Sequence, residues 1–451
     1  MDTLQKRLGP IFAFPFSRAL APPSSPSPVH ANFLELCAGG PTVDTPEDCT
    51  AYLVHVNKLS AGKWNDAWNE LLHPDYTLPN STDDFDIIIQ LCSEIAQILL
   101  DHGVLSMARI IQKLEAKKVL RPAANIQSDP NAHGLAFSLI GWLLLLYVPA
   151  KKARPNEMQA AEQRIRSGLR YKVSSELVNR PLDELLRSFG DILPRREERR
   201  DSVVSSTDLE EVRVKLEVTH LNAAALKTMA NIQIRWVDTL GEHLEFNPSD
   251  EKGPTVGVFK CPSFCRVYQS DSSILAIVLN KFYEDDEKPT DNFTVAKMIN
   301  EVMLSYTLLF KADRKARKLY QTTERTKASL IKPKNGCKPY IDPVLDELCG
   351  NHISSSFFRF GEPVREYYDS ITDFPIFKDR LRRIQDYMQG IQPNRFVSLW
   401  RDQRDLRLWY TIWMVIIFGV ISIVIGLIAL FLTAIQVDYA KKAYELQVSQ
   451  G

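Results

Sequence analysis

The chain has 451 residues, and its 55 Lys and Arg equal its 55 Asp and Glu, so the formal net charge is zero. This balance excludes a protein that binds nucleic acid through a large overall positive charge, and any basic surface must be local. The length allows two or three domains, each with its own core. The seven cysteines are odd in number and scattered, which favours reduced thiols in the cytosol over a secreted disulfide scaffold.

Residues 1–30 are rich in Pro and Ser, a composition typical of a disordered leader. Prolines interrupt the apolar stretch that follows Lys6 and Arg7. They spoil both the hydrophobic region of a signal peptide and the amphipathic helix of a mitochondrial presequence. We therefore expect no targeting helix in this segment.

Residues 31–192 predict a helical region. Apolar residues recur at helical spacing through most of residues 86–120, and Gly103 is placed to separate two helices. Residues 133–150 are the most hydrophobic segment outside the C-terminal part of the chain. Their uncharged core is about 15 residues, shorter than the roughly 20 that span a bilayer, which predicts a buried core helix.

Residues 193–212 predict an exposed charged linker, and residues 213–392 predict an α+β region. The fold class is therefore α+β, with a helix-rich N-terminal half, a small antiparallel β-sheet with helices in the second half, and one C-terminal transmembrane helix. Strand character is found at 232–237, 243–246 and 255–260, a buried strand is expected at 274–279, and helices are expected at 295–318 and 377–391.

The strongest single feature lies near the C-terminus. Residues 393–408 predict a juxtamembrane segment, 409–437 a transmembrane helix, and 438–451 a short tail. No charged residue occurs between Arg407 and Asp438, and such a stretch is long enough to cross a bilayer. Aromatic residues mark the two membrane interfaces, namely Trp409, Tyr410, Trp413 and Tyr439.

Only 14 residues follow Val437, and no upstream signal is convincing. This arrangement predicts a tail-anchored protein with a cytosolic body. The length of the span favours a secretory-pathway membrane, the endoplasmic reticulum or beyond, over the mitochondrial outer membrane.

Small residues share one face of the predicted membrane helix. In lipid, such faces allow two helices to approach closely, so we expect self-association or pairing with another membrane helix. The alternative is a chance alignment, because Gly and Ala are common in membrane helices. The face comprises Gly419, Ser422, Gly426, Ala429 and Thr433.

Two features suggest regulation at a membrane. Ser202 follows two arginines in the predicted linker, a pattern that basophilic kinases phosphorylate. Residues 311–338 are basic and fit contact with anionic lipid headgroups, although a solvated helix end explains them as well. Tyr320 is the only aromatic residue in this segment, which argues against a nucleic-acid partner. The candidate lipid contacts are Lys311, Arg314, Lys315, Arg317 and Lys318.

A dispersed enzyme site is the alternative function. Asp238, His243, Cys261 and Cys265 lie near one another in sequence, and zinc could take the histidine and both cysteines. Structural use of these residues is favoured, because no second Cys/His pair and no HExxH motif accompanies them. No catalytic, metal or cofactor-binding residue is assigned, and whether the protein is an enzyme is left open.

The chain also resembles a family of known sequences. Trp236, Asp238, Leu240, His243 and Leu244 form a W-x-D-x-L-x-x-H-L block. With the CPSFC segment and the WRDQRDLRLWYTIW segment before the membrane span, the block resembles a large uncharacterised family of filamentous-fungal proteins that end in a single C-terminal transmembrane helix. Where Gln403 stands, that family would have another arginine. The resemblance implies a fungal membrane protein and supplies no catalytic residues.

Together these features favour a tail-anchored single-pass membrane protein with a cytosolic binding, scaffold or regulatory body. Its expected partners are membrane lipid, an unidentified protein and a second copy of the chain. The alternative, a membrane-tethered enzyme, requires the four dispersed side chains to converge in a concave pocket, whereas a binding body leaves them packed.

Overall fold

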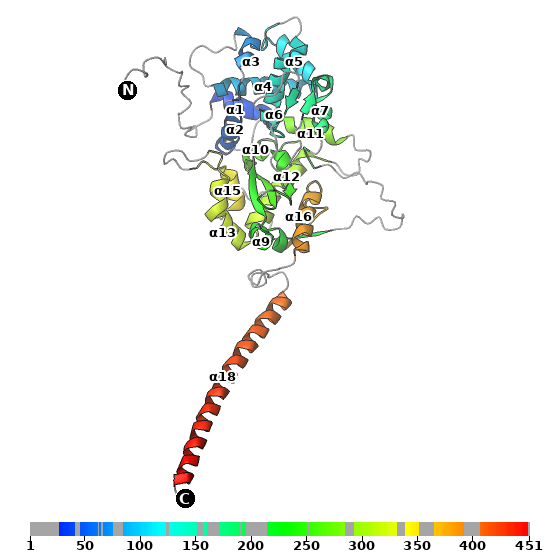
Figure 1. The fold of residues 1–451 in the computed structure, drawn as a ribbon. Coiled ribbons are helices and arrows are strands. Elements are labelled where there is room, and N and C mark those ends of the chain that lie inside the picture. The colour runs from blue at the N-terminus through cyan, green and yellow to red at the C-terminus, as the bar shows by residue number, and fades with distance from the viewer. Residues whose placement is uncertain are drawn as a thin grey trace, which may run out of the picture. The chain divides into compact units, whose positions relative to one another are not determined.

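The structure is a computed structural model, and its ribbon is shown in Figure 1. It divides into two units, Met1–Met388 and Gln389–Gly451. The unit ending at Met388 is called the body. The residues that the structure describes are 27–40, 46–61, 63–64, 66–74, 84–122, 126–150, 157–160, 172–189, 192–194, 214–250, 252–284, 293–331, 339–350, 365–391 and 406–449.

The first half of the body is mainly helical, as predicted, but residues 157–159 and 172–174 of the predicted helical region form two short paired strands. Gly103 follows α4 with φ of +73°, a left-handed conformation that suits glycine, and so separates α4 from α5. Ser106 caps α5 by accepting from the amide of Arg109. The helices are α1 (Pro28–Ala38), α2 (Pro46–Ser60), α3 (Asp66–Leu71), α4 (Asp84–His102), α5 (Met107–Ala116), η2 (Ile126–Ser128), α6 (Pro130–Leu144), η3 (Ser175–Asn179) and α7 (Leu182–Ser188).

Helix α6 is the central helix of this half. Asp129 caps its start, and nearly all of its residues are buried against α2, α3, α4 and α5. The prediction of a buried core helix is therefore confirmed. The carbonyl of Leu143 near its end accepts from the hydroxyls of Tyr52 and Tyr268 at 2.9 and 2.8 Å, which joins α6 to α2 and to the second half of the body.

Three small sheets occur among the described residues. Strands β1 (Glu157–Gln159) and β2 (Lys172–Ser174) pair antiparallel, as do β3 (Lys215–Glu217) and β7 (Tyr367–Asp369). The third sheet has the order β4-β6-β5 and comprises β4 (Gln233–Val237), β5 (Phe246–Asn247) and β6 (Thr255–Phe259).

The third sheet differs from the antiparallel sheet predicted for this region. Strand β6 pairs antiparallel with β5 but parallel with β4, so the sheet is mixed. The chain reverses twice between β4 and β6, and β5 takes the far edge. All five residues of β6 are buried, as is typical of a central strand covered on both faces.

The remaining helices surround this sheet. Residues 274–279 belong to a helix and not to the predicted strand, because Ser273 accepts from the amide of Ala276 and starts a helix that continues to Glu284. A short apolar run does not distinguish the two structures. The elements are α8 (Val218–Leu221), α9 (Ala223–Met229), η4 (Leu240–Glu242), α10 (Pro262–Val267), α11 (Ile274–Glu284), α12 (Val295–Tyr306), α13 (Arg314–Leu319), α14 (Arg325–Lys327), α15 (Pro343–Cys349) and α16 (Lys378–Gly390), with π-helical turns η5 (Thr307–Lys311) and η6 (Tyr320–Glu324).

The second unit contains α18, which runs from Leu406 to Ser449 over 44 residues, or about 66 Å at 1.5 Å per residue. Its stretch Trp413–Leu446 is long and apolar enough to cross a membrane, and none of that stretch is buried. The structure thus confirms one long apolar C-terminal helix of the kind that anchors a single-pass protein.

Candidate functional site

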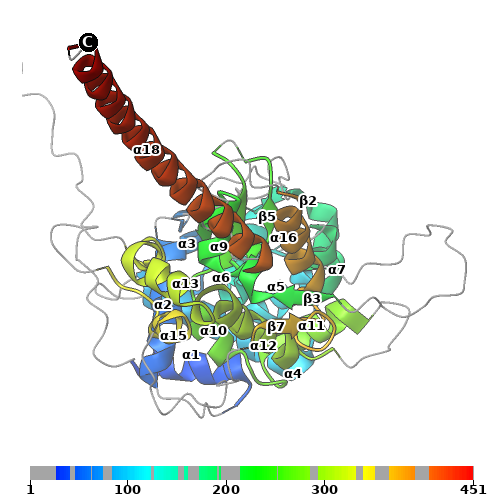
Figure 2. The same ribbon diagram turned by 90° about the horizontal axis from the view of Figure 1, so that it is seen from below.

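The block residues lie in β4 and in the loop of residues 238–245 that follows it, called here the block loop. Helix α16 lies beside β3 and β5 next to this loop, as Figure 2 shows from below. Gln385 of α16 accepts from the amide of Glu217 at 2.9 Å, and Tyr387 contacts Phe246 with ring centroids 5.0 Å apart. The block loop is thus packed between the sheet and the last helix of the body.

Arg380 of α16 fixes the conformation of the block loop. Its Nη1 donates to the carbonyls of Gly241 and His243 at 2.8 and 2.5 Å, and its Nε lies 3.2 Å from a carboxylate oxygen of Glu245. The Arg380 and Glu245 side chains are only 6% and 11% exposed. Leu244 beside them has φ of +58°, an unusual conformation for a branched side chain, and the surrounding contacts hold it there.

His243 is a structural imidazole and not an accessible base. Its Nδ1 accepts from the amide of Phe259 at 3.2 Å, so its Nε2 carries the proton and donates to Ser305 Oγ at 2.8 Å. Burial, together with the nearby Arg380 charge, lowers the pKa of His243 to about 3. The ring is therefore neutral at pH 7 and joins the block loop to β6 and α12.

Trp236 contacts both π-helical turns. Its ring stacks on Phe310 of η5 with centroids 5.6 Å apart and meets Tyr320 of η6 edge-on at 6.2 Å. Its Nε1 donates to Glu324, the last residue of η6, at 3.3 Å. The π-turns thus supply three side chains around one indole ring.

Asp238 is the block residue at the surface, with a side chain that is 37% exposed. Its Oδ1 lies 2.5 Å from Lys260 Nζ and 3.9 Å from Lys58 Nζ, and its carbonyl accepts from His55 Nε2 at 2.9 Å. Burial alone would raise the pKa of Asp238, but His55, Lys260 and Lys58 hold it below its usual value. His55 could not be found from the sequence, because no local pattern links it to Asp238, which is 183 positions away.

Cys261 and Cys265 are completely buried, and burial raises the pKa of both thiols above their usual values. Asp342, which the sequence did not indicate, accepts from the amide of Ser263 at 2.8 Å and from that of Val344 at 2.9 Å. It therefore orients the starts of α10 and α15. Among the residues that the structure describes, no group of three His, Cys, Asp or Glu side chains is arranged to hold a metal ion.

The four side chains of the alternative enzyme site thus have separate partners. Asp238 faces lysines at the surface, His243 faces Ser305 in the core, and both thiols are sealed from solvent. A pocket between α7 and α11 is lined by none of them. Their arrangement suits packing, the role that sequence reasoning favoured.

Glu301 of α12 also escaped the sequence analysis. Its carboxylate accepts from the amides of Ile376 and Phe377 at 2.9–3.1 Å, just before the start of α16. Burial, opposed by these two hydrogen bonds, raises the pKa of Glu301 to about 8. Because its pKa in the unfolded chain is 4.5, the folded state retains this proton longer, and the stability it contributes falls as pH rises from about 4.5 to 8.

Replacing Glu301 by Gln keeps an acceptor oxygen for both amides and removes the titration. We expect the stability of E301Q relative to the original protein to rise by about 2 kcal/mol between pH 6 and pH 8, because only the original protein loses the contribution of this proton. Urea unfolding of the full chain in neutral detergent at both pH values measures this difference. The matched control is E35Q, at an exposed residue of α1. An identical pH response of the two variants would contradict the role given to Glu301.

The basic candidates lie on and before α13, which Asp313 caps by accepting from the amide of Ala316 at 2.8 Å. Arg314, Lys315 and Lys318 are exposed, whereas Lys311 and Arg317 are half-buried. Further along, Arg325 is bound to Asp346 at 2.6 Å and does not add to a free positive surface. The residues from 332 to 338 lie outside the described part of the chain.

On α18, the five small residues face outward. The hydroxyls of Ser422 and Thr433 donate to the carbonyls of Phe418 and Ala429, each at 2.8 Å, so both are satisfied within the helix. Tyr410 and Tyr439 are exposed. Several predicted features lie outside the described residues, namely Ser202, most of the leader and linker, residues 392–405 and the side chain of Trp409.

Comparison of the chain with models of protein families, with curated proteins and with solved structures gives no match. The resemblance to a filamentous-fungal family therefore stays a prediction that rests on the block and the premembrane residues.

Proposed function

We propose that this protein is a single-pass membrane protein whose body lies in the cytosol and acts by binding, as a scaffold or regulator. The observation that carries the proposal is α18, a helix of 44 residues with an apolar stretch that no part of its own unit buries. In water such a surface is strongly unfavourable, and a bilayer is the environment that satisfies it.

The cysteines support a cytosolic body. Five thiols are free and buried among the described residues, at Cys37, Cys92, Cys261, Cys265 and Cys349. A reducing compartment preserves such thiols, whereas secreted domains tend to pair theirs.

A binding role is supported by the use that the fold makes of its polar residues. The titratable side chains of the block loop and its surroundings bond to backbone groups or to one another, as Arg380, His243, Glu301 and Asp342 do. A general acid or base must reach its substrate within hydrogen-bond distance, and these buried groups do not.

The membrane role of α18 is tested by adding charge to its apolar stretch. Arginine at the centre of a membrane helix costs about 2.5–3.5 kcal/mol per residue, so I423R/I425R should release the protein from membranes. The measurement is the fraction of full-length protein that remains in the membrane pellet after alkaline carbonate extraction. The control I423V/I425V should stay in the pellet. Equal retention of both variants would contradict the anchor.

The basic segment is the proposed lipid contact. In the part of the chain that the structure describes, Arg314, Lys315 and Lys318 are exposed and lie beyond 4 Å from any carboxylate. A polybasic surface of this kind gains about 1 kcal/mol per Lys or Arg from an anionic leaflet. Lys311 and Arg317 would lie at its edge.

Neutralising the three exposed charges should weaken this contact by about two orders of magnitude at low salt. The measurement is binding of the full chain in neutral detergent to a short-chain phosphatidylinositol phosphate. A variant with three basic residues replaced elsewhere on the body serves as the control and should retain affinity. A similar loss in both would show that only total charge matters. The variants are R314Q/K315Q/K318Q and the control R109Q/K113Q/K252Q.

Self-association through the small-residue face is part of the proposal. Gly419 and Gly426 have open space where a Cβ would stand, and the hydroxyls on the face are already satisfied. A second helix could therefore approach this face without leaving a buried polar group unpaired.

A further inference from the structure

A pocket of about 390 Å³ lies in the body between α7 and α11, away from the block loop. Val104, Pro181 and Ile277 give it apolar walls, and Asp183, Glu184 and Lys281 give it charge. Arg187 of α7 holds the two helices together by donating to the carbonyls of Lys281 and Phe282 at 3.0 and 2.7 Å. The volume falls in the range of small-molecule sites.

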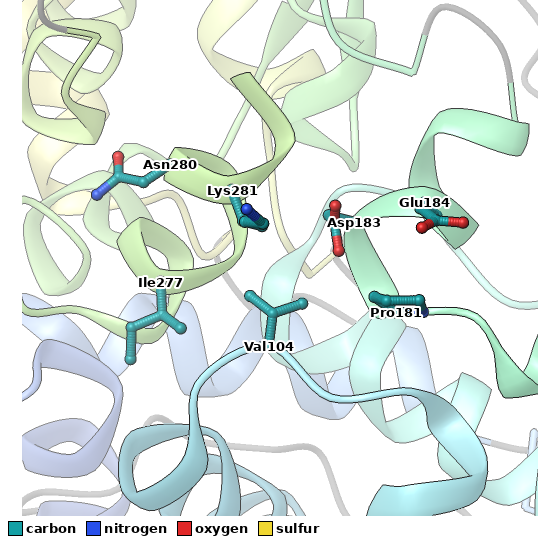
Figure 3. Close-up of a pocket in the computed structure, with 7 residues that line it drawn as sticks. All are labelled: Val104, Pro181, Asp183, Glu184, Ile277, Asn280 and Lys281. Atoms are coloured by element: carbon teal, nitrogen blue, oxygen red, sulfur yellow. The ribbon is translucent and has the colours of Figure 1, made fainter. Parts of the chain in front are cut away.

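Asp183 is the unusual residue of this pocket. The residue is only 2% exposed, and its Oδ1 is buried without a hydrogen-bond partner. No ion pair within 4 Å involves it in the part of the chain that the structure describes. In Figure 3 its carboxylate is directed to the space between α7 and α11, above Val104, whereas the Glu184 carboxylate points away. An unpaired buried carboxylate is costly, so a partner from outside the fold would relieve it.

Asn280 of α11 also lines the pocket, and its Oδ1 is buried without a hydrogen-bond partner. In Figure 3 its amide is directed away from Asp183, so the two side chains do not converge on one ligand atom. The Asp183 carboxylate therefore calls for a ligand that donates a hydrogen bond, and its negative charge favours a positive ligand.

We propose that this pocket binds a small molecule that carries a primary ammonium group. The ammonium donates to Asp183, and a short alkyl chain packs on Val104 and Ile277. An organic cation fits better than a metal ion, because the described residues hold no group of three metal-ligating side chains. The inference rests on the proposed binding role of the body but not on the membrane topology, so a ligand test in detergent and a topology test fail independently.

The test uses the full chain in neutral detergent and titration calorimetry with n-hexylamine, which is protonated at pH 7. Its neutral and anionic counterparts, 1-hexanol and hexanoate, have a similar chain. We expect hexylammonium to bind at least tenfold more tightly than either. D183N should lower its affinity at least tenfold, and E184Q, at the neighbouring carboxylate that points away, should change it less than threefold.

A second variant keeps the test valid if D183N does not fold. I277F retains Asp183 and fills part of the pocket, so it should also abolish hexylammonium binding. Equal binding of hexylammonium and hexanol would overturn the proposal, as would unchanged affinity in D183N or in I277F. A binding loss in E184Q as large as that in D183N would also overturn it, because the site would then depend on general negative charge.

Discussion

Replacing Arg380 by Leu is expected to lower the free energy of unfolding of the body by about 3–5 kcal/mol. The change removes one partner of the buried ion pair with Glu245 and takes this donor from the carbonyls of Gly241 and His243. Loss of these contacts frees the block loop from α16. Urea unfolding followed by tryptophan fluorescence, on the full chain in neutral detergent, measures the effect.

The matched control is R382L on the same helix. Arg382 is 56% exposed and lies 3.6 Å from the equally exposed Asp386, a contact of the kind that contributes little. We expect R382L to change stability by about 0.5 kcal/mol or less. Losses of similar size in the two variants would contradict the role of Arg380 as the residue that holds the block loop.

The second large effect is expected for G241A, which should lower the free energy of unfolding of the body by about 2–3 kcal/mol. A Cβ at this position would lie 2.5 Å from the carbonyl oxygen of Ile192 and 2.9 Å from that of Leu146. Both are backbone atoms, so the block loop must move away from the chain after α6 and after α7. The same unfolding measurement applies.

Gly134→Ala, in the middle of α6, provides the contrast. Its Cβ would have Trp68 Nε1 at 4.0 Å as its nearest neighbour, which is ordinary contact. Because alanine is the better helix former, G134A should be neutral or stabilising by up to about 1 kcal/mol. A protein that tolerates both substitutions equally would show that the close approach at Gly241 is not required.

For two helices, the local sequence pattern was enough to predict the structure. The buried helix α6 and the long apolar helix α18 follow from the length of their apolar runs. The α+β class follows from the change of period in the second half. By contrast, residues 274–279 have the apolar character of both a buried strand and a buried helix, and in the structure Ser273 caps a helix that packs against α4, α7 and α12.

The roles of the block residues could not be read from sequence, because their partners are distant. The Trp236 indole bonds to Glu324, 88 positions away in the sequence, and the His55 imidazole bonds to the carbonyl of Asp238, 183 positions away. In the sequence, Arg380 and Glu301 look like ordinary charged residues. Their roles become visible only when α16 packs against the block loop. The orientation of β6 also depends on β5 crossing to the far edge of the sheet, which no local signal indicates.

The candidate ligand pocket illustrates the same limit. Asp183 stands in the first turn of α7, where an acidic residue favours helix formation, and sequence alone gives it no other role. Its burial without a partner follows from the packing of α7 against α11. A site that depends on an unsatisfied atom becomes visible only when its surroundings are known.

The central claim, a cytosolic body held by α18, is tested most directly by a glycosylation map of the full chain with a sequon added after Gly451 on a short spacer. Natural sequons at Asn80 and Asn292, both outside the described residues, report on the body. We expect glycosylation of the added site alone. Glycosylation at Asn80 or Asn292 would place the body in the lumen and contradict it.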